Sequence, residues 1–573
     1  MKTWKVIGCL LFVWLGIMVY MSNSLFQSSD SNPSDIERQL KRALRELDKL
    51  KAQNDEFRSL VTDIKDQINT ENAEPIKKRV AEAVKPVAVV KSKVCDATGP
   101  SLLHEQRRRK IENDVVEFWY FMRSELKKMK STSKGDIVRV VDRVLSDGAN
   151  YQKTLHNDFN LLRNVENAGE LMKKESEELG RLVQKRFKYL QNPKDCASAK
   201  KLVCNLSKGC GYGCQLHHVT YCMMVAYATK RTLILESRGW RYASRGWESV
   251  FLPLSDNCKD KKGSSSRPWA DPDIIRDAQV VEMPIVDSLH PRPNYLPLAI
   301  PMDLSDRLMR LHGDPAVWWI GQFVKYLTRP QPQLQTDMEN AKAKLGFSKP
   351  IVGVHVRRTD KVGTEAAFHS IDEYMLYVEE YYDRLEAREP VHTRKVYLAS
   401  DDPSVLPDAK SRYPHYTFIS DIEITKTAGL NKRYTDQSLH GIIMDIHFLS
   451  LSDYLVCTFS SQVCRVAYEM MQTMHADASA YFKSLDDIYY FGGQNGHHME
   501  VLEKHISKQP KEIDMEPGDS VGIAGNHWDG YSKGMNRRTG KDGLFPSYKT
   551  QSKVVIVDLP TYSEVDEDSH IDQ

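Results

Sequence analysis

The sequence predicts an α/β protein with parallel sheets, preceded by a helical region. Beyond Pro193, short apolar runs bounded by turn residues alternate with helical patterns such as Ile371–Leu385 and Gln462–Met474. This alternation is typical of strands joined by helical crossovers, which makes the strands parallel. The predicted strands are Thr232–Glu236, Gln279–Met283, Pro350–Val356, Lys395–Ser400, Tyr416–Ser420 and Asp453–Cys457. Helical patterns dominate residues 105–190, until Asn192-Pro193 breaks them.

Length and charge limit the class of protein. A chain of 573 residues is long enough for several domains, and 27% charged with 41% hydrophobic residues is ordinary globular composition. A net charge of +3 argues against a nucleic-acid-binding protein, which would carry a concentrated basic face.

The N-terminus carries an apolar run from Val6 to Met21, preceded by Lys2 and Lys5. With Trp4 and Tyr20 as interface anchors, this run predicts a signal-anchor helix with a cytosolic N-terminus and a lumenal body. A cleaved signal peptide is the alternative, although no clear cleavage site follows the run.

A heptad series over residues 34–70 predicts a coiled coil and a dimer, with Asn54 at an a position, where a buried Asn fixes register. The alternative is a single amphipathic helix. Residues 71–100, with Pro75, Pro86 and Pro100, read as a linker. The heptad positions are Ile36, Leu40, Ala43, Leu47, Leu50, Asn54, Phe57, Val61, Ile64 and Ile68.

Six of the ten cysteines lie between 196 and 258, which favours disulfides in an oxidising compartment. Zinc is the alternative, since Cys210 and Cys214 with His217 and His218 have ligand-like spacing. Cys9 lies in the apolar span, so the remaining count is odd, and the isolated Cys95 is the candidate for an interchain bond or a free thiol.

Four polar groups follow predicted strands or open a helix in the second half of the chain. They are His355 with Arg357 and Arg358, the pair Asp401-Asp402, Asp445, and Ser460-Ser461-Gln462. Ligands of open α/β sheets bind at the carboxyl ends of the strands. Arginine forks and helix N-termini bind phosphate, and a buried Asp accepts the paired N–H groups of guanine. The groups therefore predict a nucleotide site, the alternatives being a solvated charged turn and ordinary helix caps.

Two further features bear on chemistry. The glycine-rich turn Gly209–Cys214 can bring backbone amides onto phosphate from the opposite side, although it is no P-loop. Glu365 is placed to act as a general base, with Lys361 beside it, unless both are surface residues. The short D-x-D patterns at Asp271 and Asp566 arise readily by chance, so we expect no metal.

Three motifs together resemble the α-1,6-fucosyltransferase family, the enzymes that core-fucosylate N-glycans. They are His355–Lys361, Ser460–Cys464 and Gly209–Cys214, and long runs such as Val286–Pro293 and His312–Trp319 are similar as well. The resemblance extends from about residue 105 through 560, and the stem before residue 100 matches in type only. It implies a GDP-fucose donor, a GT-B-like architecture, inversion at the fucose carbon, no cofactor and no metal.

The resemblance also implies residue roles. Arg357 would bind the diphosphate with Gly211, Gly213 and Ser461, while His355 and Asp445 would contact guanine. Glu365 would be the base for the acceptor hydroxyl, with Lys361 and Arg357 assisting. The remaining donor contacts would be Arg358, Asp360, Tyr374, Asp401, Asp402 and Gln462. The acceptor contacts would be Lys208, Glu365, Gln462, Asp486, Asp487 and His527.

The resemblance further implies four disulfides and an SH3-like C-terminal module. The cysteine pairs would be Cys196–Cys258, Cys204–Cys222, Cys210–Cys214 and Cys457–Cys464. Met515–Asp519, Trp528 and Gly543–Tyr548 look like SH3 segments, but the usual opening aromatic motif is missing, so we expect contact with glycan or an oligomeric partner instead of proline-rich peptides. We expect the sequon at Asn205 to be unused, or its glycan to point away from Lys208.

The predicted protein is a homodimeric, single-pass type II Golgi membrane enzyme that acts on N-glycoproteins with terminal GlcNAc and binds no nucleic acid. Its predicted divisions are a cytosolic tail at 1–5, a signal anchor at 6–22, a stem at 23–100, a helical region at 101–190, a disulfide-rich open α/β domain at 191–345, a Rossmann-type GDP-fucose-binding domain at 346–495, an SH3-like domain at 496–560 and an acidic tail at 561–573.

Overall fold

The computed structural model describes residues 99–163, 165, 168–359, 363, 366–427 and 433–566. The predicted anchor, the coiled coil and Cys95 lie outside these residues. Within them, no helix is long and apolar enough to cross a membrane.

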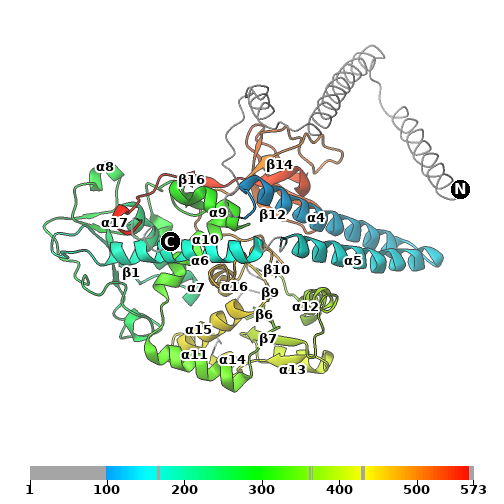
Figure 1. The fold of residues 1–573 in the computed structure, drawn as a ribbon, viewed down its shortest axis with the longest axis horizontal. Helices are drawn as coiled ribbons and strands as arrows, with labels where there is room; N and C mark the ends of the chain where they lie inside the picture. Colours follow the sequence, from blue (N-terminus) through cyan, green and yellow to red (C-terminus); the bar gives the residue numbers. More distant parts are fainter. Residues whose placement is uncertain are drawn as a thin grey trace, which may run out of the picture. The chain divides into compact units, whose positions relative to one another are not determined.

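Three long helices precede the sheets: α4 (Leu102–Thr132), α5 (Asp136–Arg163) and α6 (Ala168–Gln191). Helices α4 and α5 lie side by side (Figure 1). Helix α6 ends where Asn192-Pro193 was predicted to break it, and its fully buried Leu179, Val183 and Phe187 face the core.

The first α/β half contains a four-stranded parallel sheet in the order β2-β1-β4-β3. Its strands are β1 (Lys201–Asn205), β2 (Thr232–Glu236), β3 (Ser266–Pro268) and β4 (Val280–Glu282). The crossover from β1 to β2 is α7 (Tyr212–Ala228), which is buried along nearly all of its length. Further elements of this half are α8 (Pro272–Ile275), β5 (Ala299–Pro301), α9 (Ser305–Leu311), α10 (Pro315–Leu327) and α11 (Pro332–Leu345).

The second half contains a five-stranded parallel sheet in the order β10-β9-β6-β7-β8. Its strands are β6 (Val352–Val356), β7 (Lys395–Ser400), β8 (Thr417–Ile419), β9 (Tyr454–Cys457) and β10 (Phe482–Ser484). The helices between them are α12 (Ile371–Glu386), α13 (Val405–Arg412), α14 (Ile422–Thr427), α15 (Asp436–Leu451) and α16 (Gln462–Met471). The predicted α/β class and its parallel strands are confirmed.

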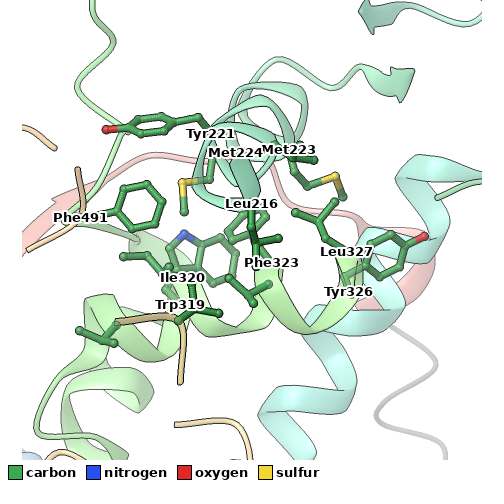
Figure 2. Packing of buried hydrophobic residues seen from close by; sticks show 14 of the residues in the cluster. Leu216, Tyr221, Met223, Met224, Trp319, Ile320, Phe323, Tyr326, Leu327 and Phe491 are labelled. Atoms are coloured by element: carbon green, nitrogen blue, oxygen red, sulfur yellow. The ribbon is translucent and has the colours of Figure 1, made fainter. Parts of the chain in front are cut away.

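One apolar core runs through both halves. Trp319, Ile320 and Phe323 of α10 pack beneath Leu216 and other residues of α7, as Figure 2 shows. Phe491, which follows the second sheet, belongs to the same cluster. The two halves therefore share a continuous apolar interior, and its close packing fixes one half against the other.

The C-terminal region forms an antiparallel five-stranded sheet in the order β14-β13-β12-β11-β15. Its strands are β11 (His498–Val501), β12 (Ser520–Asn526), β13 (Tyr531–Asn536), β14 (Asp542–Pro546) and β15 (Thr550–Ser552). A small core that includes Val501, Met515, Val521 and Phe545 supports it.

The chain beyond this sheet departs from the predicted boundaries. Strand β16 (Val555–Val557) pairs in parallel with β5 of the first half, so the C-terminal module ends before residue 560. Tyr562, which falls in the predicted acidic tail, is buried and packs on Tyr227 and Tyr189, ahead of the short helix α17 (Ser563–Asp566). Burial of apolar and aromatic side chains outweighs the acidic composition that suggested a tail.

Candidate active site

The carboxyl end of β6 carries the first predicted group. All five residues of β6 are buried, including His355, whose Nδ1 has no hydrogen-bond partner among the described residues. Burial lowers the pKa of His355 to about 4; the carboxylate of Asp401 opposes this shift and Arg357 adds to it. The imidazole is therefore neutral at physiological pH, and one ring nitrogen remains for a polar ligand.

Asp401, at the end of the adjacent strand β7, anchors the turn that follows β6. Its carboxylate pairs with the guanidinium of Arg357 and accepts hydrogen bonds from the amides of Arg358 (2.9 Å) and Thr359 (3.1 Å). The hydroxyl of Thr359 donates to it as well. A buried carboxylate that accepts this many hydrogen bonds fixes the conformation of the turn. Asp401 therefore has a structural role in holding Arg357, Arg358 and Thr359 in place.

Arg358 and Asp402 are similarly occupied. The Arg358 guanidinium lies 4.5 Å from the centre of the Phe368 ring and 3.6 Å from the carboxylate of Asp402. Asp402 also accepts from the amide (2.9 Å) and hydroxyl (2.7 Å) of Ser404. Arg358 is therefore held in a cation–π and ionic environment that shapes the loop beside Arg357.

The N-termini of α7 and α16 meet beside this edge. A Cβ atom on Gly213 would lie 2.9 Å from Cβ of Gln462 and 3.2 Å from its backbone carbon. Close helix packing thus requires the glycine at 213, whereas a Cβ on Gly211 would have no neighbour within 4 Å. Gly213 was predicted to contact a diphosphate; its contact in the structure is with Gln462.

Neither of these two helices has a side-chain cap. Gly211, which precedes α7, has no side chain to offer, and the side chain of Ser461, which precedes α16, forms no cap hydrogen bond. The carboxamide oxygen of Gln462 is buried without a partner among the described residues. Amides of an uncapped first turn, together with the helix dipole, favour an anion at this junction.

Tyr242 is a residue at this junction that the sequence interpretation missed. Its hydroxyl accepts from the amide of Tyr212 at 3.1 Å, and burial raises its pKa to about 12, with Arg357 among the opposing charges. Arg241 lies 3.7 Å over the ring of Tyr434, which packs against Tyr242. The Arg-Tyr pair after β2 was the available sequence signal, but only the fold places it near Arg357.

Asp445, on α15, accepts a 2.8 Å hydrogen bond from the hydroxyl of Tyr397. Burial raises the pKa of Asp445 to about 7; the bond from Tyr397 opposes the shift and Asp421 adds to it. A carboxyl group in this environment can take either protonation state near neutral pH.

Three of the predicted acceptor residues, Asp486, Lys208 and His527, lie in different parts of the fold. Asp486 follows β10, where Oδ1 accepts from Ser484 at 2.9 Å and Oδ2 is buried without a partner among the described residues. Lys208, ahead of α7, pairs with Asp287 at 2.7 Å. His527 is exposed in the turn between β12 and β13, and the nearby indole of Trp528 donates to the carbonyl of Asp486 at 3.1 Å.

Five predicted residues remain to be placed. Asp487 is exposed as a whole, but partial burial of its carboxyl group raises its pKa, and the nearby carboxylate of Asp486 adds to the shift. Tyr374, on α12, is buried, and burial raises its pKa, with Asp486 adding to the effect. Asp360, Lys361 and Glu365 lie outside the described residues.

The cysteines form the four predicted disulfides: Cys196–Cys258, Cys204–Cys222, Cys210–Cys214 and Cys457–Cys464. The zinc alternative is wrong for Cys210 and Cys214, because their sulfurs are bonded to each other. In the described part of the chain, one His/Cys group has metal-like geometry, Cys204 with His218 and Cys222, and its two sulfurs are also joined. The discounted D-x-D pattern at Asp271 forms a helix cap, since the side chain of Asp271 accepts from the amide of Asp273 at 3.0 Å.

Comparison with known proteins gives the family. Residues 1–490 match the family model for α-(1,6)-fucosyltransferase N- and catalytic domains. The α-(1,6)-fucosyltransferase of Drosophila melanogaster is 45% identical over 96% of both chains. That of Caenorhabditis elegans is 40% identical over 94% of this chain and 95% of its own. The solved fucosyltransferase NodZ from Bradyrhizobium is 14% identical over 47% of this chain and 92% of its own, with a TM-score of 0.29. The match over nearly the whole of both relatives shows that the chain belongs to the α-(1,6)-fucosyltransferase family.

Proposed function

We propose that this fucosyltransferase transfers fucose from GDP-fucose to the 6-hydroxyl of the innermost, Asn-linked GlcNAc of N-glycans, with inversion and without a metal. The observation that carries the proposal is the junction of the two sheets. There the anchored Arg357 lies at a strand end beside two uncapped helix N-termini. This arrangement suits a diphosphate leaving group, whose charge grows as the bond to fucose breaks.

The donor would lie across this junction, in a GT-B-like manner. Arg357 and the first-turn amides of α7 and α16 would bind the diphosphate. His355 is neutral and has one ring nitrogen without a partner among the described residues, and Asp445 is buried with one oxygen held by Tyr397. Both suit the polar edge of guanine. These are fixed dipoles and charges, so little reorganisation is required as charge develops.

Glu365 would remove the proton from the acceptor hydroxyl while Lys361 assists. Since attack comes from the face opposite GDP, a single displacement inverts the configuration at the fucose carbon. Lys208, Asp486, Asp487 and His527 would contact the glycan.

The test is a transfer assay with the purified protein, GDP-fucose, a GlcNAc-terminated N-glycan and a chelator, followed by linkage analysis of the product. We expect core-linked fucose from the wild type, and a loss of about 10²–10⁴-fold in kcat for Glu365→Gln, the usual contribution of a general base. Fucose at another glycan position or on protein, strict dependence on a divalent cation, or undiminished activity of Glu365→Gln would contradict the proposal.

We also propose that the protein is a Golgi type II membrane enzyme and a homodimer. Four disulfides support an oxidising compartment. On α5, Ile137, Val140, Val144, Tyr151 and Leu155 are exposed at helical spacing, an apolar face that supports self-association in addition to the coiled coil. Protease protection in microsomes tests the topology, and sedimentation of the purified protein tests the dimer.

The C-terminal sheet is proposed to be an SH3-like module that presents His527 to the glycan. The attachment of its β12–β13 turn to Asp486 supports this role.

A further inference from the structure

Lys483, in the middle of β10, is a buried cation that the proposed reaction does not use. Its side chain is enclosed by three aromatic rings from three separate elements. The ammonium lies 3.9 Å from the ring centre of Trp528, 4.3 Å from that of Tyr120 and 5.1 Å from that of Tyr377. It also donates a 2.8 Å hydrogen bond to the hydroxyl of Tyr120. We call Lys483 and these three residues the cage.

The cage balances opposing effects on the charge of Lys483. Burial lowers the pKa of the ammonium to about 7, and the carboxylates of Glu380 and Glu117 oppose that shift, while Arg123 adds to it. Ring faces carry negative potential and attract a desolvated cation. The contacts of this one ammonium group therefore connect α4, α12 and the C-terminal module.

Trp528 connects the cage to the proposed acceptor site. Its indole N–H donates to the carbonyl of Asp486 at 3.1 Å, and its amide donates to the side chain of Asn526 at 2.7 Å. The Asn526 amide group in turn donates to the buried carboxylate of Glu117 at 2.9 Å. His527 lies between Asn526 and Trp528, so both of its neighbours are fixed while it remains exposed.

The backbone of the same turn is fixed on α4. Trp528 has a φ of 55°, a left-handed conformation that a bulky residue adopts only when its surroundings impose it. Gly530 has a φ of 88°, and a Cβ there would lie 2.8 Å from Cβ of Phe121. The turn therefore has one conformation, set by contacts on both of its sides.

We propose that Lys483, Tyr120 and Trp528 are positioning residues for the glycan acceptor, which hold His527 in a fixed place beside Asp486 and Asp487. The inference rests on the proposed acceptor role of those three residues. The cage itself touches neither Arg357 nor the ends of α7 and α16 in any contact that the structure shows, so it acts on the acceptor side of the reaction.

The test compares Lys483→Met, Lys483→Arg and Trp528→Phe with the wild type. Lys483→Met removes the charge, Lys483→Arg keeps a cation, and Trp528→Phe keeps a ring over Lys483 but removes the indole N–H. The matched control is Arg329→Met, which removes another cation that lies 3.8 Å over a tyrosine ring, that of Tyr326 in the first half. For each protein we would measure kcat, KM for glycan and for GDP-fucose, and donor hydrolysis without acceptor.

Lys483→Met should raise KM for the glycan about tenfold, and Trp528→Phe about fivefold, the usual worth of one hydrogen bond. KM for GDP-fucose and donor hydrolysis should stay within about twofold of the wild type. Lys483→Arg should recover most of the loss, and hydrogen exchange of residues 526–531 should quicken in Lys483→Met and Trp528→Phe but not in Arg329→Met.

Equal changes in KM for the glycan and for GDP-fucose would overturn the inference. An unchanged KM for the glycan in both Lys483→Met and Trp528→Phe would overturn it too. Unchanged exchange in the turn would overturn it as well. If the proposed function is wrong, the wild type itself will form no core-linked product. Hydrogen exchange would still report whether the cage fixes the turn, so the two failures can be told apart.

Discussion

The helices α7 and α16, which begin at the junction of the two sheets, start differently from α4 and α12. Ser370 caps α12 with a complete capping box, and Ser101 caps α4 by accepting from the amide of His104 at 3.2 Å. Gly211 and Ser461, ahead of α7 and α16, provide no side-chain cap. Caps stabilise a helix end locally, whereas the two uncapped helices depend on packing and keep first-turn amides for an anion. The two uncapped helix ends lie where a charged ligand is proposed to bind.

The largest effect should come from removing the cation beside the uncapped helices. We expect Arg357→Ala to lower kcat about 10²–10³-fold, the usual effect of losing one group that stabilises developing charge. Steady-state kinetics with saturating GDP-fucose gives the value. Arg394 is the matched control, since it pairs with Asp383 and Glu386 at the opposite end of β7. A comparable loss in Arg394→Ala would show that the effect comes from stability and not from the leaving group.

The next effect should come from Asp445. As pH rises through about 7, its carboxyl ionises and can accept two guanine N–H groups, so KM for GDP-fucose should fall between pH 6 and 8. Asp445→Asn should raise that KM about 10–100-fold at pH 8, as expected for hydrogen bonds to a charged group, and should remove its pH dependence. A KM that varies with pH equally in both proteins would assign the titration to another group.

The same carboxyl should affect stability with the opposite trend. Its folded pKa of about 7 lies above the unfolded value of about 3.9, so ionisation is more costly in the folded protein. The contribution to the free energy of unfolding is therefore complete below about pH 4 and is lost as pH rises towards 7. Denaturant melts of Asp445→Asn should show a weaker fall in this window than those of the wild type.

Substitution of the two glycines at the junction should have two different effects, one on stability and one on donor binding. Gly213→Ala forces a Cβ against Gln462 and should lower the free energy of unfolding by about 1–3 kcal/mol, the usual cost of overpacking. Gly211→Ala meets open space, so its melting temperature should not change, while KM for GDP-fucose rises several-fold. Thermal melts and donor kinetics on both variants separate the two roles; identical behaviour would remove the distinction.

The smallest effect should come from a capped helix. Ser370→Ala removes one half of the capping box of α12 and should cost about 1 kcal/mol of stability. Because the N-terminus of α12 is not part of the proposed diphosphate site, kcat and both KM values should stay near those of the wild type. Ser370→Thr, which keeps the hydroxyl, should retain the stability.

Much of the second half could be predicted from residues alone. Strand β7 has the predicted bounds, and α12 and α16 begin at the predicted residues, because apolar runs and the polar residues ahead of a helix are local signals. The disulfide pairs followed only from family resemblance. Tyr242, the cage and the pairing of β16 with β5 were missed, since each depends on contacts between distant segments that leave no local pattern. The hydrogen bonds from the turn to Asp401 were also missed, because a carboxylate that holds a turn and one that binds a ligand look alike in sequence. Its contact with the donor stays a prediction.

The pairing of β16 with β5 has a practical consequence for engineering the C-terminal module. Where the chain enters the module, Asn495 donates through its amide to the carbonyl of Pro297 at 2.7 Å and through its side chain to that of Pro293 at 3.1 Å. Where the chain leaves, β16 hydrogen-bonds along Ala299–Pro301. Both attachments are made to one short segment, so the module behaves as an insertion with two fixed ends. A swap or deletion should therefore cut after Asn495 and before Val555 together, and simple truncation from the C-terminus would strip a strand from the first half.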